Sequence, residues 1–244
     1  MYHSVTIGSM NTFSDWHLVP DSRPVIALPE TKTVTVDIPG SNGILDLSES
    51  LTHYPLYNNR SGTLTFHVLN DYTPWDVLYH RIANYLHGRR RTLVLEDDPM
   101  YYYIGRYAIE WTSNNDGTWS DVAINYELDP YKQFIQTSIQ EDSRLYENIS
   151  VSNTTVNRNL TGDRTIGEIP VIPEFIATVP NGSTMTVTLT NHELGISELK
   201  KTINSSGTWK FHDLIFSNMR GDNPLFLKIS GRGSLNVLFR RQAL

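Results

Sequence analysis

Three consecutive arginines at residues 89–91 stand shortly before an acidic run, Glu96-Asp97-Asp98, and both are residue types that could do chemistry. An arginine cluster can bind phosphate, and paired carboxylates can act as the acid and nucleophile of a glycosidase or hold calcium. The acidic run lacks the alternating Asp/Asn positions, central glycine and terminal glutamate of an EF-hand loop. The opposite charges also cancel much of each other's field, because they lie within about one Debye length of ~8 Å. The stretch therefore favours a helix end followed by a turn.

Other residues that could catalyse a reaction or bind a metal are scattered. The chain has no cysteine, which removes thiol nucleophiles and cysteine-ligated zinc. His80 and His87 would lie ~10 Å apart along a helix, too far for one zinc ion. Neither an H-E-x-x-H nor a G-x-S-x-G motif occurs. We therefore predict no enzyme activity, no cofactor and no metal site.

Charge is divided unevenly along the chain. Residues 1–138 contain 9 Lys+Arg against 16 Asp+Glu, and residues 139–244 contain 11 against 10, which gives the net charge of −6. Nucleic-acid-binding modules usually carry a basic excess on one face, so neither half is expected to bind nucleic acid. No signal-peptide pattern opens the sequence, and no apolar stretch approaches the ~20 residues that cross a bilayer. We expect no membrane insertion.

One helix is expected to position the arginines. In DYTPWDVLYHRIANYLHG, Thr73 can act as N-cap, Pro74 fits the first helical position, and Gly88 stands where a left-handed C-cap belongs. The apolar residues of this segment fall close to one face of the helix. They are Trp75, Leu78, Ile82, Tyr85 and Leu86.

Short strands are expected on both sides of this helix. The Pro-rich stretch LVPDSRPVIALPE is predicted as an extended loop, and Asp97-Asp98-Pro99 as the turn between two strands. The strands predicted in the first half are SVTIG, TKTVTVDIPG, GTLTFHVLN, TLVLE, MYYYIGRYAIEW and WSDVAINYELDPY.

The second half is predicted to be an antiparallel sandwich or barrel, because short strands alternate with Gly-, Asn- and Ser-rich turns. KQFIQTSIQEDSRLYEN is predicted as a linker, and Gly231-Arg232-Gly233-Ser234 as a hairpin turn. The predicted strands are PEFIATV, STMTVTLT, ISELKKTI, GTWKFH, DLIFSN, NPLFLKIS and GSLNVLFRR.

Two tryptophans could contact a sugar, since sugar sites stack rings on exposed aromatic side chains. Trp209 is followed by Lys210 and His212, and Trp16 by His17. Burial in a β-sandwich core is the favoured interpretation of both. Trp209 is kept as a candidate sugar contact.

Three motifs occur in one order along the chain: VDIPGSNGILDLSESLTHYPLYNNRSGTLTF, then LHG with DDP, YY and GR, then DPYK. Together they resemble the signatures of the distal tail proteins of siphophages and prophages. The family often has a glycine after the Leu-Thr pair, where this chain has His53. The matching positions are Asp37, Pro39, Gly40, Gly43, Asp46 and Arg60 in the first motif, Gly88, Asp97, Asp98, Gly105 and Arg106 in the second, and Asp129 and Pro130 in the third.

The resemblance implies a mainly β protein of two domains. Residues 1–138 would form a β domain with one helix that assembles into a hexameric ring, and residues 139–244 a galectin-like antiparallel β-sandwich. The ring would be a hub that joins the tail tube protein to the tail-associated tip protein, with the outer domain available to a receptor-binding protein. The protein would be a structural part of the virion tail tip, made in the bacterial host cytoplasm from a phage or prophage genome.

A ring needs two complementary surfaces on each subunit, because it closes by head-to-tail contacts. The acidic first half and its isolated arginine cluster could supply them. The four motif glycines are interpreted as turn, cap or close-approach positions. A carbohydrate-binding sandwich that uses Trp209 is the alternative function. The candidate assembly surface consists of Arg89, Arg90, Arg91, Asp97 and Asp98.

Overall fold

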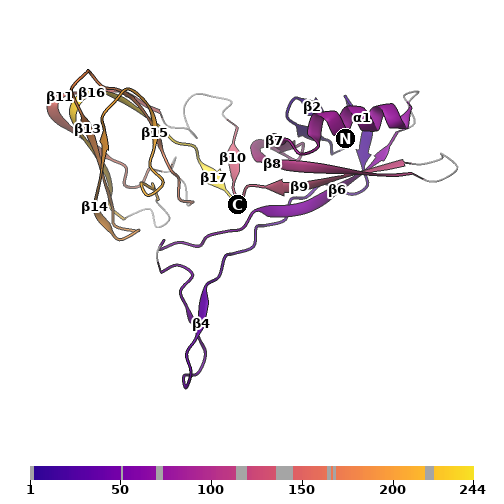
Figure 1. Cartoon of the computed structure of the whole chain (residues 1–244), viewed down its shortest axis with the longest axis horizontal. Helices are drawn as coiled ribbons and strands as arrows, with labels where there is room; N and C mark the ends of the chain where they lie inside the picture. Colours follow the sequence, from indigo (N-terminus) through magenta and orange to yellow (C-terminus); the bar gives the residue numbers. More distant parts are fainter. Residues whose placement is uncertain are drawn as a thin grey trace. The chain divides into compact units, whose positions relative to one another are not determined.

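The computed structural model describes residues 3–50, 52–69, 74–113, 120–135, 145–163, 166, 169–217 and 223–244. The chain divides into two compact units. The first consists of the residues up to Asp37, Leu56–Ile135 and Leu244, and the second of Ile38–Pro55 and Gln136–Ala243. Figure 1 colours both along the sequence. The expected boundary between residues 138 and 139 lies outside the described residues. The prediction of a mainly β chain of two parts is confirmed.

An antiparallel sheet forms the first unit. Its strands lie in the order β2-β1-β7-β8-β9-β6-β3, and β10 pairs with β8 at the start of that long strand (Figure 1). The chain therefore supplies neighbouring strands from distant parts of the sequence. The bounds are β1 Val5–Ile7, β2 Met10–Asn11, β3 Leu18–Pro20, β6 Arg60–Val68, β7 Arg90–Leu95, β8 Asp98–Ser113, β9 Ser120–Leu128 and β10 Lys132–Phe134.

The helix α1, Trp75–Leu86, packs against the sheet. It buries Leu78, Ile82 and Leu86, the face that the sequence predicts, together with the core of the sheet. Pro74 is the N-cap rather than the first helical residue, because its ψ of 133° is extended. Thr73, the expected N-cap, lies outside the described residues.

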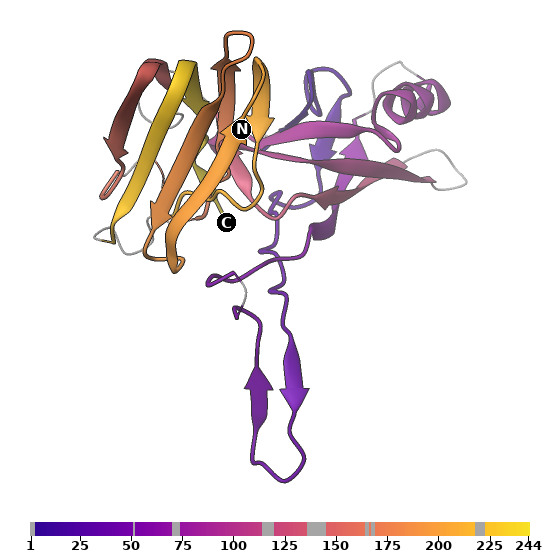
Figure 2. The same ribbon diagram turned by 60° about the vertical axis from the view of Figure 1, so that its left-hand side comes forward.

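Strands β4, Thr35–Asp37, and β5, Ile44–Asp46, form a separate two-stranded hairpin (Figure 2). Its chain reverses through Ile38-Pro39-Gly40-Ser41, where Ser41 N donates to Ile38 O at 3.0 Å and Gly40 has a φ of 84°. Pro at the second position and a left-handed Gly at the third are typical of a type II turn. Every residue from 31 to 47 is exposed. Residues 33–47 are called the arm below.

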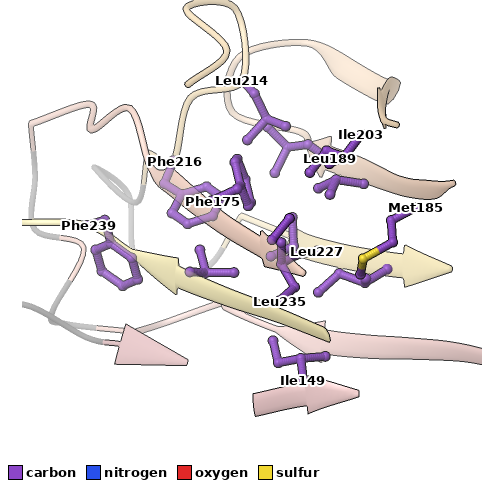
Figure 3. Close-up of a cluster of buried hydrophobic side chains, with 14 of the residues drawn as sticks. Ile149, Phe175, Met185, Leu189, Ile203, Leu214, Phe216, Leu227, Leu235 and Phe239 are labelled. Atoms are coloured by element: carbon purple, nitrogen blue, oxygen red, sulfur yellow. The ribbon is translucent and has the colours of Figure 1, made fainter. Parts of the chain in front are cut away.

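The second unit is a curled antiparallel sheet whose inner face forms one hydrophobic core (Figure 3). Its strands lie in the order β14-β13-β16-β12-β15. The remaining strand, β11, pairs with the edge of β16 that faces away from β12 and β13. The bounds are β11 Leu145–Asn159, β12 Glu174–Thr178, β13 Met185–Asn191, β14 Ile196–Ile203, β15 Gly207–Lys210 and β16 Leu225–Leu238. The short strand β17, Gln242–Ala243, does not belong to this sheet.

The hairpin turn predicted at residues 231–234 is wrong. β16 runs through these residues as one strand and stays paired with β11 throughout. Gly231 and Gly233 have φ values of 109° and 148°, and a Cβ at these positions would meet Thr184 O and Thr178 O. Along the edge of β16 opposite β11, the pairing partner changes from β13 to β12. The two glycines let β16 bend at this point.

Two further sequence interpretations are wrong. The linker predicted at residues 132–148 is strand at both ends, because its start forms β10, Lys132–Phe134, and its end belongs to β11, which begins at Leu145. Its left-handed Asn148 and Asn153 lie at register shifts, so the alternation that marks a strand is interrupted twice. In the segment DLIFSN, the described residues 213–217 form only an isolated bridge, between Phe216 and Val171.

Candidate assembly surfaces

The second and third motifs meet at one end of the first sheet, at a place called the motif corner below. Arg90 and Arg106 are paired residues of β7 and β8, and Arg90 forms an ion pair with Asp129. Asp129 N donates to Ile104 O at 2.8 Å, and Arg106 Nη1 donates to Gly88 O at 2.9 Å. These contacts hold the helix end, the β7–β8 pair and the segment after β9 together.

The glycines of the corner are required by local geometry. Gly88, directly after the helix, has a φ of 70°, and its N–H donates to Tyr107 O at 2.8 Å. Gly105 pairs with both Arg91 and Leu128, and a Cβ there would collide with the backbone of β9. A side chain at either position would strain or displace the corner.

Arg60, a residue of the first motif, also lies near the motif corner. Its Nε donates to Pro130 O at 2.9 Å and its Nη1 to Ala27 O at 2.7 Å. The residue is only 3% exposed, and its guanidinium lies 5.4 Å from the centre of the Tyr103 ring. Burial lowers the pKa of Arg60, and its Nη2 has no hydrogen-bond partner among the described residues. Arg60 is thus a buried cation that spans two main-chain carbonyls.

The arginine triplet does not present one surface. Arg90 is held by Asp129, and Arg91 donates from Nε to Tyr85 O at 3.0 Å, with its guanidinium 3.8 Å from the Tyr85 ring centre. That geometry is a cation–π contact. The exposed side chain of Arg89 has no polar partner among the residues that the structure describes. Only Arg89 remains fully available to another molecule.

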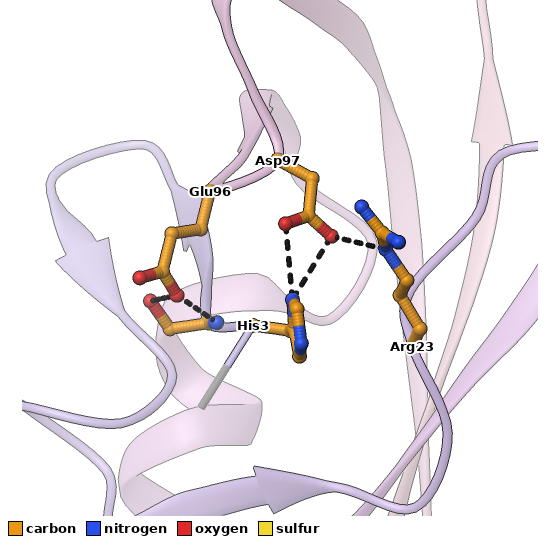
Figure 4. A network of polar contacts seen from close by, with 5 residues as sticks. His3, Arg23, Glu96 and Asp97 are labelled. Carbon is orange, nitrogen blue, oxygen red and sulfur yellow. Dashed lines mark hydrogen bonds and ion pairs between the residues drawn. The ribbon is translucent and has the colours of Figure 1, made fainter. Parts of the chain in front are cut away.

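The acidic turn is engaged within its own unit (Figure 4). Glu96 accepts hydrogen bonds from the N–H of Ser4 at 2.6 Å and from its hydroxyl at 3.1 Å. Asp97 accepts from Arg23 Nε at 2.8 Å and contacts His3 Nδ1 at 3.0 Å, and these two partners lower the pKa of its carboxyl.

The turn consists of Glu96 and Asp97, not of residues 97–99 as predicted, because Asp98 pairs with Leu95 and begins β8. Asp98 forms an ion pair with Lys132 at 2.9 Å. The three consecutive carboxylates therefore contact different partners and do not converge on a common substrate position. This arrangement supports the interpretation of the run as turn chemistry.

The arm contains the remaining motif positions. Asp37 ends β4, and Asp46 accepts hydrogen bonds from the N–H and hydroxyl of Ser48 at 2.9 and 2.5 Å, which lower the pKa of its carboxyl. Gly43, like Gly40, has a φ of 84°. His53 occupies the expected glycine position with a φ of 61°, so the backbone keeps a conformation that glycine adopts most easily.

The arm also exposes an unusual number of large aliphatic side chains. A soluble hairpin usually buries one face, but this one is exposed along both strands. The sequence pattern showed the alternation but not that none of the described residues covers this hairpin. The exposed side chains are Val34, Val36, Ile38, Ile44, Leu45 and Leu47.

The two tryptophan rings differ from the open, exposed aromatic rings on which sugars stack. Trp16 is buried in the first core. Trp209 is half-buried and stacks on Phe211 with ring centres 6.0 Å apart, and its indole N–H donates to Ser205 O at 3.2 Å. One ring face and the polar edge of Trp209 are therefore already engaged.

Other kinds of site are absent from the described parts of the chain. No group of three or more His, Asp or Glu residues there could hold a metal ion. Within the same residues, no helix combines the length and apolar character needed to span a membrane.

Comparison with known proteins adds one result. No protein-family model matches the sequence, and no curated protein matches it. Among solved structures, the chain matches a hub protein of a phage adsorption apparatus over its whole length. That protein is the Dit protein (gp 19.1) of SPP1, described as a paradigm of the hub adsorption apparatus in phages that infect Gram-positive bacteria. The sequences are 16% identical, the TM-score is 0.59, and the match covers 100% of both chains. The resemblance to distal tail proteins is confirmed at the level of the fold.

Proposed function

We propose that this chain is a distal tail protein, a structural subunit of a phage or prophage tail. The observation that carries the proposal is the match of both units, over the whole chain, to the fold of the SPP1 hub protein. The three motifs support it, because their residues Arg60, Arg106 and Asp129 lie around one corner of the first unit. The role is assembly and not catalysis.

Self-assembly would explain why the arm exposes large aliphatic side chains. A two-stranded hairpin is marginally stable in water, and each large aliphatic side chain that becomes buried stabilises a complex by roughly 1.5–3 kcal/mol at most. The arm exposes six such side chains. A second copy of the chain that covers them would give a head-to-tail contact, and such contacts form a ring when their rotation closes. The proposed ring is a hexamer.

Ion pairs between charged side chains would add further contacts to the ring. Arg89 at the motif corner is exposed, and the arm carries exposed Asp37 and Asp46. Carboxylates of a neighbouring subunit, or of the tail tube or tail-associated tip protein above and below the ring, are the proposed partners of Arg89. This proposal replaces a partner surface that uses all three arginines and the acidic turn, since most of those groups are paired locally.

The part of the second unit that follows about residue 139 would be the outer galectin-like domain. Its core is independent of the first, since the two hydrophobic clusters share no residue. It would stand between the ring and a receptor-binding protein in the virion tail tip.

The mass of the assembled protein tests the proposal. One chain is 27.8 kDa, so six copies would give about 167 kDa by light scattering on a size-exclusion peak. Negative-stain images of that peak should show rings. A matched pair of variants controls the result: Ile44→Asp in the arm should leave a monomer, whereas Val77→Asp on the exposed face of α1 should still assemble. A wild-type protein that stays at 27.8 kDa at every concentration would contradict self-assembly.

A further inference from the structure

We propose that the buried guanidinium of Arg60 is a binding site for a small monovalent anion of about the size of chloride. The inference goes beyond the assembly role and does not depend on the proposed ring. It is drawn from the burial of Arg60, from the charges around it and from the hydrogen-bond donors beside it.

Arg60 is a buried charge without a counter-charge among the described residues. The residue is 3% exposed. Burial lowers the pKa of its guanidinium, and the side chains that oppose this effect are Tyr103 and Tyr126, not a carboxylate. Tyrosine is uncharged near pH 7, whereas arginine keeps its proton there. Because buried arginines are almost always paired with a charge, this one calls for an anion.

The groups that contact Arg60 stabilise its charge without neutralising it. Nε donates to Pro130 O at 2.9 Å and Nη1 to Ala27 O at 2.7 Å, and the ring centre of Tyr103 lies 5.4 Å from the guanidinium. Main-chain carbonyls and aromatic rings carry no net charge. The buried Nη2 donates to none of the described residues. A buried donor of this kind is normally paired with protein, water or an ion.

The hydroxyl of Tyr126 is a second donor beside Arg60. Burial raises the pKa of Tyr126, while the N–H of Ala27, which donates to the hydroxyl, and the charge of Arg60 oppose this rise. The hydroxyl oxygen therefore already accepts one hydrogen bond, and its proton is left to donate. A water molecule that accepts from Nη2 would leave the charge of Arg60 uncompensated. An anion accepts from both donors and also supplies the missing charge.

Close packing limits the size of the anion. Tyr126 is 6% exposed, and its hydroxyl lies so near to Gly62 that a Cβ there would approach it to 2.4 Å. Gly105 of β8 is packed as tightly, since its Cβ would lie 2.6 Å from Cα of Leu128 in β9. Such surroundings exclude a nucleotide or a sugar phosphate. Sulfate carries two charges, of which a single guanidinium balances one, so the site favours a monatomic anion.

An anion at this position would stabilise the folded first unit. Arg60 joins β6 to the extended chain at Ala27 and to Pro130 after β9, so the anion would strengthen a contact among three segments. A ligand that binds only the folded state raises the melting temperature as its concentration rises. The protein should therefore be more stable in chloride than in a salt whose anion is too large to enter.

Thermal denaturation of the full chain tests the site, with chloride as the probe. Sodium chloride replaces sodium gluconate, a salt with a bulky anion, at constant ionic strength and constant protein concentration. A rise of about a hundredfold in chloride concentration should raise the melting temperature by roughly 3–10 °C. Arg60→Met should abolish this rise. The matched control, Arg89→Met at an exposed arginine, should retain it.

A second measurement gives a result even if Arg60→Met does not fold. Crystals of the unmodified protein are soaked in sodium bromide, and bound bromide is located by its anomalous scattering. We expect a bromide ion within hydrogen-bond distance of Arg60 Nη2. Bromide found only at adventitious surface positions would overturn the inference.

The denaturation experiment has two further outcomes that overturn the site. Equal melting temperatures of the wild type in chloride and gluconate would mean that Arg60 is satisfied without an anion. A chloride effect of the same size in wild type and Arg60→Met would mean that the anion binds elsewhere. None of these outcomes depends on whether the chain forms rings, so the inference and the proposed function fail separately.

Discussion

Arg60 donates a hydrogen bond from Nε to the carbonyl oxygen of Pro130 at 2.9 Å, although 70 residues separate them in the chain. The contact joins the first motif to the third. Because the same guanidinium also holds Ala27 O, one buried side chain fixes both the start of the arm-bearing segment and the end of β9. The motif arginine is therefore a structural anchor.

Replacement of Arg60 should show which of two opposing effects is larger. Arg60→Met keeps most of the volume and removes a buried charge whose Nη2 has no partner, but it leaves two carbonyls without their donor. An unpaired buried polar group costs about 1–3 kcal/mol, so we expect the free energy of unfolding to fall by roughly 1–3 kcal/mol. Urea denaturation measures this change. Exposed Arg89→Met is the control and should change it by less than about 0.5 kcal/mol. An Arg60→Met protein as stable as wild type would mean that charge burial offsets both hydrogen bonds.

His53, which follows the arm in the chain, offers a test of backbone strain. Its φ of 61° is left-handed, and its N–H donates to Glu49 O at 2.8 Å. A non-glycine residue in this conformation is destabilised by roughly 1–2 kcal/mol. His53→Gly should therefore slow hydrogen exchange of this amide by several-fold relative to His53→Ala, which keeps the strain. Equal exchange in the two variants would show that the turn opens without passing through this conformation.

The sequence predicted correctly those elements whose local residue pattern agrees with their burial in the fold. The helix was found because its apolar face, its proline start and its glycine end all indicate the same element. The strands β6 and β9 were found because their side chains alternate between a buried and an exposed face. In each case burial follows the period of the element.

The wrong predictions have a common physical cause. Pairing between strands that are distant in the sequence overrides the preference of the local residue pattern. β11 is polar and contains two left-handed asparagines, yet β16 pairs with it along most of its length. Gly231 and Gly233 have turn-like composition but form a bend inside a strand. In the candidate site, residues of all three motifs lie close together, but their role in assembly stays a prediction. Which arginine stays unpaired depends on contacts with Tyr85 and Asp129 that spacing cannot reveal.

The stability of the first unit should depend on pH through His67. This residue of β6 contacts Asp121 through Nδ1 and Asp21 through Nε2 at 2.9 Å, and the two carboxylates raise its pKa above 6.5. A raised pKa stabilises the folded state fully below the unfolded value, and the contribution is lost as pH rises through the folded value. Wild type should thus exceed His67→Asn in melting temperature near pH 6, and the difference should shrink towards pH 9. In an Asp21→Asn, Asp121→Asn background the difference should not vary with pH. A gap that widens with rising pH would contradict the assignment.

Charge reversal at neighbouring arginines should separate assembly from folding. Arg89 is exposed and has no polar partner in the described structure, whereas Arg90 is held by Asp129 within the motif corner. Arg89→Glu should weaken ring assembly while the melting temperature stays unchanged. The defect should be larger at low salt, because added ions screen charges that lie more than ~8–10 Å apart in solvent. Arg90→Glu should instead lower the melting temperature, because it places a carboxylate beside Asp129. Light scattering and thermal denaturation across a salt series measure both effects. If Arg89→Glu assembles normally in low salt, Arg89 does not face a carboxylate in the ring, and the apolar arm must supply the contact without it.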